Sequence, residues 1–159
     1  MTKTIAETII EEIEGCHETI LRLCQDVPLA ALTAPVLANG WSVKDTLAHI
    51  AAWDWRCALL LGESFHTNTP LKAHPDVDAL NLEIYEERRD WSWAEVEIDF
   101  QGARRALLRA IRELPADRLE DAVIRESIAE ETCEHYQQHI PELEQWRAQL
   151  VDSRISRRG

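Results

Sequence analysis

The sequence predicts an all-α protein, specifically a four-helix bundle whose second and third long helices are joined by a long crossover that contains an extra short helix. Only five glycines and two phenylalanines occur among 159 residues, while apolar residues repeat at steps of three and four. A chain of this length with 45% hydrophobic residues can bury one continuous core. We therefore expect one domain over residues 1–152 and a frayed basic tail over residues 153–159.

The first predicted helix covers about residues 4–27. Its apolar positions follow one helix face, and proline at position 28 cannot continue the helix. These positions are Ile5, Ile9, Ile13, Cys16, Ile20, Cys24 and Val27.

The second predicted helix covers about residues 43–61. Asn39-Gly40 indicates a turn before it, and Ser42 with Asp45 three residues later is typical of a capping box. Gly62 is expected to end this helix.

The crossover is predicted over residues 63–91. Residues 63–75 are rich in Thr, Asn, Pro and His without periodicity, which favours a loop. Asp76 or Asp78 is then expected to cap a shorter helix that reaches Arg89.

The remaining two long helices are predicted over residues 92–114 and 126–150. Ser92 and Glu95 form a second capping-box pattern at the start of the former. The latter has an apolar face that includes two histidines, and Pro141 predicts a kink or local break inside it. That face consists of Ile128, Thr132, His135, His139, Leu143, Trp146 and Leu150.

Charge and composition exclude several classes of function. A formal net charge of −12 repels a phosphate backbone, so we expect no nucleic-acid partner. No stretch approaches the roughly 18 uncharged apolar residues of a membrane span, and the N-terminus does not have the pattern of a secretory signal, so a cytoplasmic location is expected. The four cysteines lack a C-x-x-C pair and are predicted to be reduced and buried: Cys16, Cys24, Cys57 and Cys133.

Three histidines carry the predicted chemistry. His135 and His139 lie one helical turn apart on a face that should meet the core, and His49 lies on the inward face of the second helix. Buried imidazoles need partners, and three of them can share one divalent ion, such as Zn²⁺, Ni²⁺, Mn²⁺ or Fe²⁺, with a coordination position left for water or substrate. The alternative is three ordinary pocket histidines that hydrogen-bond to carbonyl groups.

Four further side chains are candidates for the surroundings of this site. Asp45 and Glu131 each precede a histidine by one turn and are predicted to fix the ring tautomers from a second coordination shell. Trp53 follows His49 on its face and is a candidate pocket wall, although packing alone also explains it. His17 borders the inward face of the first helix, where it would contact a bound molecule or serve as a satisfied core histidine. No catalytic nucleophile or general base is identified.

Two motifs resemble the DinB-like superfamily: Gly40-Trp41-Ser42 through His49, and His135-Tyr136-Gln137-Gln138-His139-Ile140. Residues 81–114 also resemble the ClbS/DfsB branch of that superfamily. The resemblance implies a four-helix bundle with a long crossover and a divalent metal held by His49, His135 and His139. Similar proteins include thiol-dependent S-transferases, a maleylpyruvate isomerase and a hydrolase.

Two hypotheses of function follow. In the first, the chain is a metal-dependent thiol S-transferase or hydrolase that acts on an electrophilic small molecule in detoxification or self-protection, with a low-molecular-weight thiol as a possible cosubstrate. In the second, it is a non-catalytic bundle that sequesters a small molecule in a tryptophan-lined cleft, with an incidental metal or none. A homodimer is compatible with either.

Overall fold

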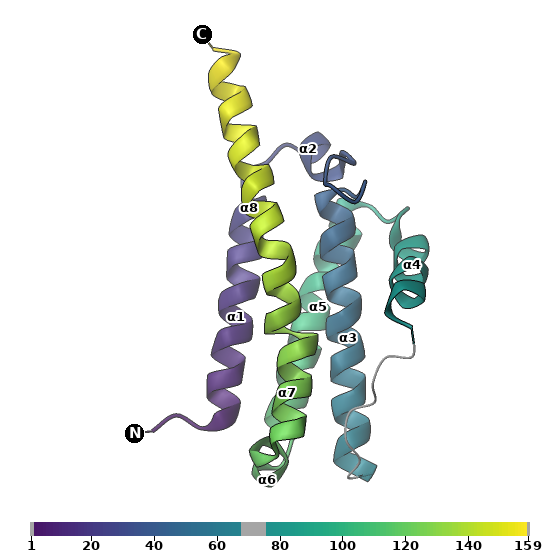
Figure 1. Cartoon of the computed structure of the whole chain (residues 1–159), viewed down its shortest axis with the longest axis vertical. Coiled ribbons are helices and arrows are strands. Elements are labelled where there is room, and N and C mark those ends of the chain that lie inside the picture. The colour runs from purple at the N-terminus through teal and green to yellow at the C-terminus, as the bar shows by residue number, and fades with distance from the viewer. Residues whose placement is uncertain (1, 68–75, 159) are drawn as a thin grey trace.

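The computed structural model describes residues 2–67 and 76–158, and every regular element within them is a helix, which confirms the all-α prediction. The long helices run side by side as rods (Figure 1). They are α1 (Ile5–Cys24), α3 (Val43–Thr67), α5 (Trp93–Glu113), and a last rod made of α7 (Ala122–Glu131) and α8 (Cys133–Ser156). The shorter helices are α2 (Leu29–Thr33), α4 (Val77–Arg88) and α6 (Ala116–Glu120).

The predicted helix starts agree with the structure where local hydrogen bonds define them. At the start of α3, the Asp45 backbone N–H donates to Ser42 Oγ at 3.1 Å, and the Ser42 N–H donates to Asp45 Oδ2 at 2.9 Å. Ser92 and Glu95 form the same reciprocal pair at the start of α5. Each box satisfies backbone donors that a helix N-terminus would otherwise leave without partners.

The predicted ends of the first two long helices were wrong. α1 stops at Cys24, and Asp26 has a positive φ of 55° in the turn that follows. α3 continues through Gly62 to Thr67, because a glycine inside a helix costs only about 1 kcal/mol and the preceding Leu61 is fully buried. Residues 68–75 of the predicted loop lie outside the described residues.

The last rod also differs from the prediction. The break lies at Thr132, with φ −120° and ψ −95°, and not at Pro141, which α8 spans. The Thr132 hydroxyl donates to the Ile128 carbonyl at 2.6 Å, a local bond that competes with regular helix geometry.

The C-terminal tail was expected to begin after residue 152, but that boundary falls inside α8. The tail is helical as far as Ser156, and the side chains of residues 151–158 are exposed.

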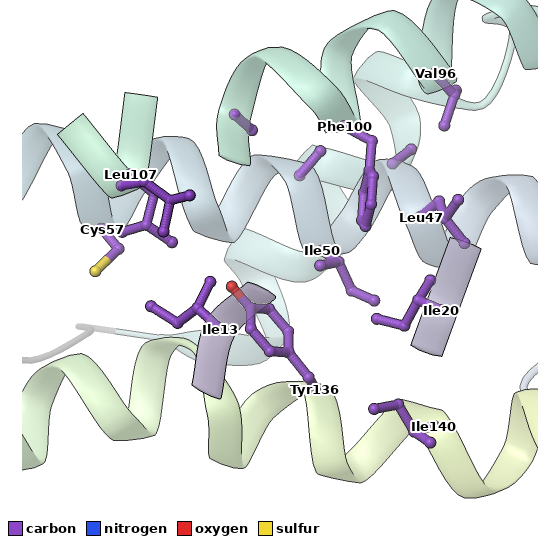
Figure 2. Packing of buried hydrophobic residues seen from close by; sticks show 14 of the residues in the cluster. Ile13, Ile20, Leu47, Ile50, Cys57, Val96, Phe100, Leu107, Tyr136 and Ile140 are labelled. Atoms are coloured by element: carbon purple, nitrogen blue, oxygen red, sulfur yellow. The ribbon is translucent and has the colours of Figure 1, made fainter. Parts of the chain in front are cut away.

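The core receives side chains from all four rods (Figure 2). Ile13 of α1, Ile50 of α3, Phe100 of α5 and Tyr136 of α8 are each fully buried. α3 packs most extensively against α5, and α1 packs against α8. The crossover helix α4 packs on the outer side of α3, where Ile84 joins a small separate cluster with Trp53 (Figure 1).

The structure also bears on two further predictions, the burial of the four cysteines and the expectation of no membrane span. Cys24 and Cys57 are buried, as predicted, but Cys16 and Cys133 are only half-buried, because both line a surface hollow formed by α1 and α8. Among the described residues, no helix combines the length and the apolar character that crossing a bilayer requires.

Candidate metal centre

The structure brings His49 of α3 together with His135 and His139 of α8. The Nε2 atoms of His49 and His135 are 2.8 Å apart, and those of His135 and His139 are 3.1 Å apart. All three potential ligand atoms lie within 4.8 Å of one another. The single turn between His135 and His139 places both rings on one face of α8, and that face meets α3.

The turn before α3 shapes the same region. Gly40 adopts φ 82°, which a side chain would disfavour, and the Leu37 N–H donates to the Trp41 carbonyl at 3.0 Å across the turn. The Trp41 ring centroid thereby lies 5.2 Å from that of His49. The Asn39-Gly40 turn predicted from the sequence therefore positions an aromatic ring beside the first histidine.

Burial keeps the three imidazoles neutral. It lowers the pKa of His49 to about 2, with further lowering by His135 and His139. It lowers the pKa of His135 to about 3, with help from His139. Burial also lowers the pKa of His139, partly offset by Glu142. Neutral rings retain a nitrogen lone pair, which is the form that binds metals.

The three rings cannot satisfy one another. His135 Nε2 lies within hydrogen-bond distance of both other Nε2 atoms, yet a neutral ring nitrogen carries one proton or one lone pair. At most one of the two contacts is therefore a good hydrogen bond. Within the described part of the chain, the Nδ1 atoms of His49 and His135 are buried without a hydrogen-bond partner.

This donor set fits a divalent cation. Tetrahedral ligation by imidazole, at about 2.0 to 2.1 Å per bond, separates the nitrogens by about 3.3 Å. The separations of 2.8 and 3.1 Å fall a few tenths of an ångström short, a difference that small ring movements can make up. A shared cation would also replace the conflicting contacts between like nitrogens.

The histidines line a surface hollow of about 410 Å³. Trp53, predicted as a pocket wall, lines this hollow, and its ring centroid lies 5.6 Å from that of His135. Glu131, a candidate from the sequence, also lines the hollow. Sequence reasoning did not single out the remaining lining residues as pocket residues, because they come from separate segments: Asn39, Trp41, Val77, Asn81, Glu130 and Gln138.

Helix α4 forms one wall of the hollow. Trp53 Nε1 donates to Asn81 Oδ1 at 3.0 Å, and the Tyr85 ring stacks on Trp41 with 5.5 Å between centroids. Lys44 Nζ donates to the backbone carbonyl groups of Arg89 and Trp91 just after α4. The extra helix in the crossover therefore contributes directly to the candidate site.

Asp45 and Glu131 were predicted to fix the histidine tautomers, but neither carboxyl group hydrogen-bonds to the Nδ1 atom of His49 or His135. Asp45 accepts from the Ser42 hydroxyl at 2.7 Å and from its N–H, so it caps α3 and does not hydrogen-bond to His49. Glu131 lines the hollow but does not hydrogen-bond to His135 Nδ1. Burial raises the pKa of Glu131 to about 7, and Arg56 offsets part of that rise. Glu131 can therefore exchange a proton near neutral pH.

His17 belongs to a different cluster, in the core. Its Nε2 lies 3.0 Å from Asp54 Oδ2, and both side chains are fully buried. The Tyr136 hydroxyl donates to the other Asp54 oxygen at 2.5 Å. The sequence interpretation missed Asp54 and Tyr136, although a carboxylate one turn after Ile50 on the inward side of α3 was an available signal.

A larger hollow of about 870 Å³ lies between α3 and α5, and its lining includes Trp55, Arg105 and Arg109. No histidine or cysteine is among the described residues that line it. Of these two hollows, the smaller one is therefore the one that holds the histidine cluster.

Comparisons with known proteins agree with this architecture. The chain is similar over 95% of its length to the crystal structure of an uncharacterised protein from Escherichia coli UTI89, with a TM-score of 0.77, 15% identity and 96% of that chain covered. At this identity the likeness shows a shared fold. No curated protein matches. Residues 13–151 match the model of the mycothiol maleylpyruvate isomerase N-terminal domain. The chain therefore belongs to this domain family, within the DinB-like superfamily.

Proposed function

We propose that this protein binds one divalent metal ion through His49, His135 and His139 and uses it in a thiol-dependent or hydrolytic reaction on an electrophilic small molecule. One observation carries the proposal: three neutral imidazole Nε2 atoms converge at the wall of a hollow, where among the described residues they contact only one another. Membership of a family whose description names mycothiol, a thiol, supports the thiol-dependent form.

The surrounding residues suit such chemistry. A divalent ion on three neutral ligands supplies Lewis acidity that lowers the pKa of a thiol or of water. Trp41 and Trp53 shield the histidines from solvent and offer flat apolar surfaces to a substrate. The carboxyl group of Glu131, with a pKa of about 7, is suited to take up or release a proton beside them.

The finer parts of the proposal rest on the sequence resemblance. The likeness of residues 81–114 to the ClbS/DfsB branch supports a self-protective transferase or hydrolase. The resemblance to thiol-dependent S-transferases of the DinB-like superfamily supports a low-molecular-weight thiol as cosubstrate. A cytoplasmic location is proposed from the cysteine pattern. Imidazole ligands suit Zn²⁺, Ni²⁺, Mn²⁺ and Fe²⁺, so metal analysis is needed to identify the bound ion.

Metal analysis of untagged protein tests the site. We expect about one metal ion per chain in the wild type and substoichiometric metal in His135→Ala and His139→Ala. Gln138→Ala is the matched control, because Gln138 lies on the same helix and lines the same hollow without belonging to the histidine cluster. Equal metal content in wild type and both histidine variants would disprove the proposed ligands.

Activity requires a separate assay. Glutathione and mycothiol, each with 1-chloro-2,4-dinitrobenzene, probe thiol transfer, while 4-nitrophenyl acetate probes hydrolysis. We expect a rate enhancement that disappears on chelation, returns with added metal and is absent in His135→Ala.

The aromatic walls favour a second candidate, a binding protein without catalysis. Trp41 stacks on Tyr85, and Trp53 faces the same hollow. If metal-free protein and His135→Ala bind 1-naphthol as tightly as the metal-loaded wild type, and no probe reaction is accelerated, sequestration is the better description.

A further inference from the structure

We propose that Asn81 of α4 sets the specificity of the hollow that the three histidines line, by donating a hydrogen bond to a carbonyl oxygen of a flat, neutral, apolar substrate. The inference rests on the proposed function only in taking this hollow as the substrate site. Asn81 is half-buried and lines the hollow together with Trp53. Trp53 Nε1 donates to Asn81 Oδ1 at 3.0 Å, and this bond determines which end of the amide group is left for a ligand.

The orientation of the Asn81 amide group follows from the chemistry of its partner. An indole N–H can only donate, so the amide atom opposite Trp53 Nε1 must be the oxygen. The nitrogen end carries two N–H donors, and within residues 2–67 and 76–158 no group accepts a hydrogen bond from it. A half-buried donor of this kind gains from an acceptor that a ligand supplies.

Further contacts of α4 hold this amide group in place. Ile84, one turn after Asn81, packs against Trp53 in the small cluster on the outer side of α3. The Tyr85 ring stacks on Trp41 with an interplanar angle of 4°. A donor on a helix that is anchored in this way is positioned before the ligand arrives, which reduces the ordering that binding costs.

Other residues of the hollow define the class of ligand. Trp41 and Trp53 offer aromatic surfaces, which favour a flat apolar molecule. Glu130 and Glu131 line the same hollow, and carboxyl groups there disfavour a ligand that carries a carboxylate. Of the acceptors that an amide N–H can recognise, a neutral carbonyl oxygen therefore fits best. Conjugated carbonyl compounds are electrophilic, so this class agrees with the proposed function.

Equilibrium dialysis with a matched set of naphthalenes tests the inference on the full-length protein. 2-Acetylnaphthalene carries a ketone, 2-ethylnaphthalene lacks the acceptor, and 2-naphthoate carries a negative charge. Because the ketone and the hydrocarbon differ in hydrophobicity, the ratio of their Kd values is compared between protein variants. The hydrocarbon also reports whether the hollow of each variant is intact, since its binding needs no hydrogen bond.

Asn81→Asp gives the sharpest comparison. Aspartate keeps an oxygen for Trp53 Nε1 and replaces the N–H donors with a second acceptor. We expect the Kd of the ketone to rise by about tenfold relative to that of the hydrocarbon. Gln138→Ala is the matched control, because Gln138 carries an amide group that lines the same hollow from α8. This variant should leave the ratio unchanged.

Each measurement is made on protein as purified and repeated after chelation. A ratio that is unchanged in Asn81→Asp, or lowered equally by Gln138→Ala, would overturn the role of Asn81. An Asn81→Asp effect that vanishes on chelation would assign the carbonyl group to a metal and overturn it as well. Tighter binding of 2-naphthoate than of the ketone, or no binding of the ketone to the wild type, would overturn the ligand class. Metal content is measured separately, so this inference and the proposed metal site can fail independently.

Discussion

Two clusters of buried polar side chains lie side by side between α3 and the neighbouring rods. One contains His49, His135 and His139, and the other contains His17, Asp54 and Tyr136. They are adjacent in the chain, because His135 and Tyr136 are consecutive residues that point to different sides of α8. In the core cluster, the Asp54 carboxyl group accepts from the Tyr136 hydroxyl and lies 3.0 Å from His17 Nε2, so chemically unlike groups meet. Among the described residues, neither ring nitrogen of His17 has a well-aligned hydrogen bond.

In the part of the chain that the structure describes, no carboxyl group hydrogen-bonds to the three histidines of the other cluster. Its members are chemically alike, and burial makes all of them poor proton acceptors. Unlike groups in contact can stabilise a fold, whereas like groups in contact require something from outside. This difference predicts that the core cluster contributes mainly to stability and the histidine cluster mainly to binding.

The largest expected effect is on the core cluster. Asp54→Ala removes the acceptor shared by His17 and Tyr136 and leaves both buried without it. We expect a loss of about 3 to 5 kcal/mol in the free energy of unfolding, measured by urea denaturation. Asp90→Ala is the control, because the Asp90 side chain is 92% exposed, and it should change stability by less than about 0.5 kcal/mol. Similar losses in both variants would remove the distinction between the clusters.

Metal should stabilise the protein through the other cluster. With free metal at one hundred times its Kd, binding to the folded state adds about 2.7 kcal/mol. Thermal unfolding with Zn²⁺, Ni²⁺ or Mn²⁺ should therefore show a higher Tm than chelator-treated protein. His135→Ala should abolish the rise, since this ring contacts both other histidines. A rise that persists in this variant would assign the metal to another site.

The pH dependence of stability separates the clusters further. Burial lowers the pKa of His49 from 6.5 to about 2. Below pH 6.5 the unfolded chain takes up a proton that the folded chain refuses, so the stability contributed by this group is complete above that pH and is lost as the pH falls. Glu131 acts with the opposite sign: its pKa rises from 4.5 to about 7, so its contribution is complete below pH 4.5 and is lost as the pH rises toward 7.

A matched variant isolates the histidine effect. In metal-free protein between pH 6 and pH 4, wild type should lose stability more steeply than His49→Gln by about 1.4 kcal/mol per pH unit, because glutamine does not titrate. Glu131 is present in both proteins, so its contribution cancels. Urea denaturation at several pH values measures the two slopes. Parallel slopes would mean that His49 is not held in its neutral form.

The smallest expected effect concerns the wall over the histidines. Tyr85→Leu removes the stacking on Trp41 and should cost about 0.5 to 1.5 kcal/mol, with faster hydrogen exchange in α4. Tyr85→Phe keeps the ring and should behave as wild type. If both variants exchange alike, stacking does not hold α4 in place.

Features set by neighbours in the chain were predictable. Ser42 and Ser92 begin their helices through bonds to residues three positions away, and the i, i+4 pair of histidines must share one face of α8. The preference for partners close in the chain also explains why the prediction for Asp45 was wrong. Asp45 was expected to reach His49, but its carboxylate satisfies the start of its own helix instead.

Features that depend on distant packing were not predictable in this way. The interruption at Thr132 carries no proline or glycine, and the helix accommodates Pro141. Asp54 acquires its role only when α1 and α8 supply His17 and Tyr136. The wall formed by α4 depends on the docking of the crossover against α3, which periodicity alone does not describe.

The interruption at Thr132 has an evolutionary consequence. In an uninterrupted helix, each residue inserted upstream would rotate His135 and His139 by about 100° and carry them off the face that meets α3. Because α8 begins anew at Cys133, insertions or deletions within α6 and α7 can be absorbed before that point. Relatives that differ in length there can therefore keep the same two imidazoles aimed inward, so this end of the bundle can diverge while the histidine geometry stays constant.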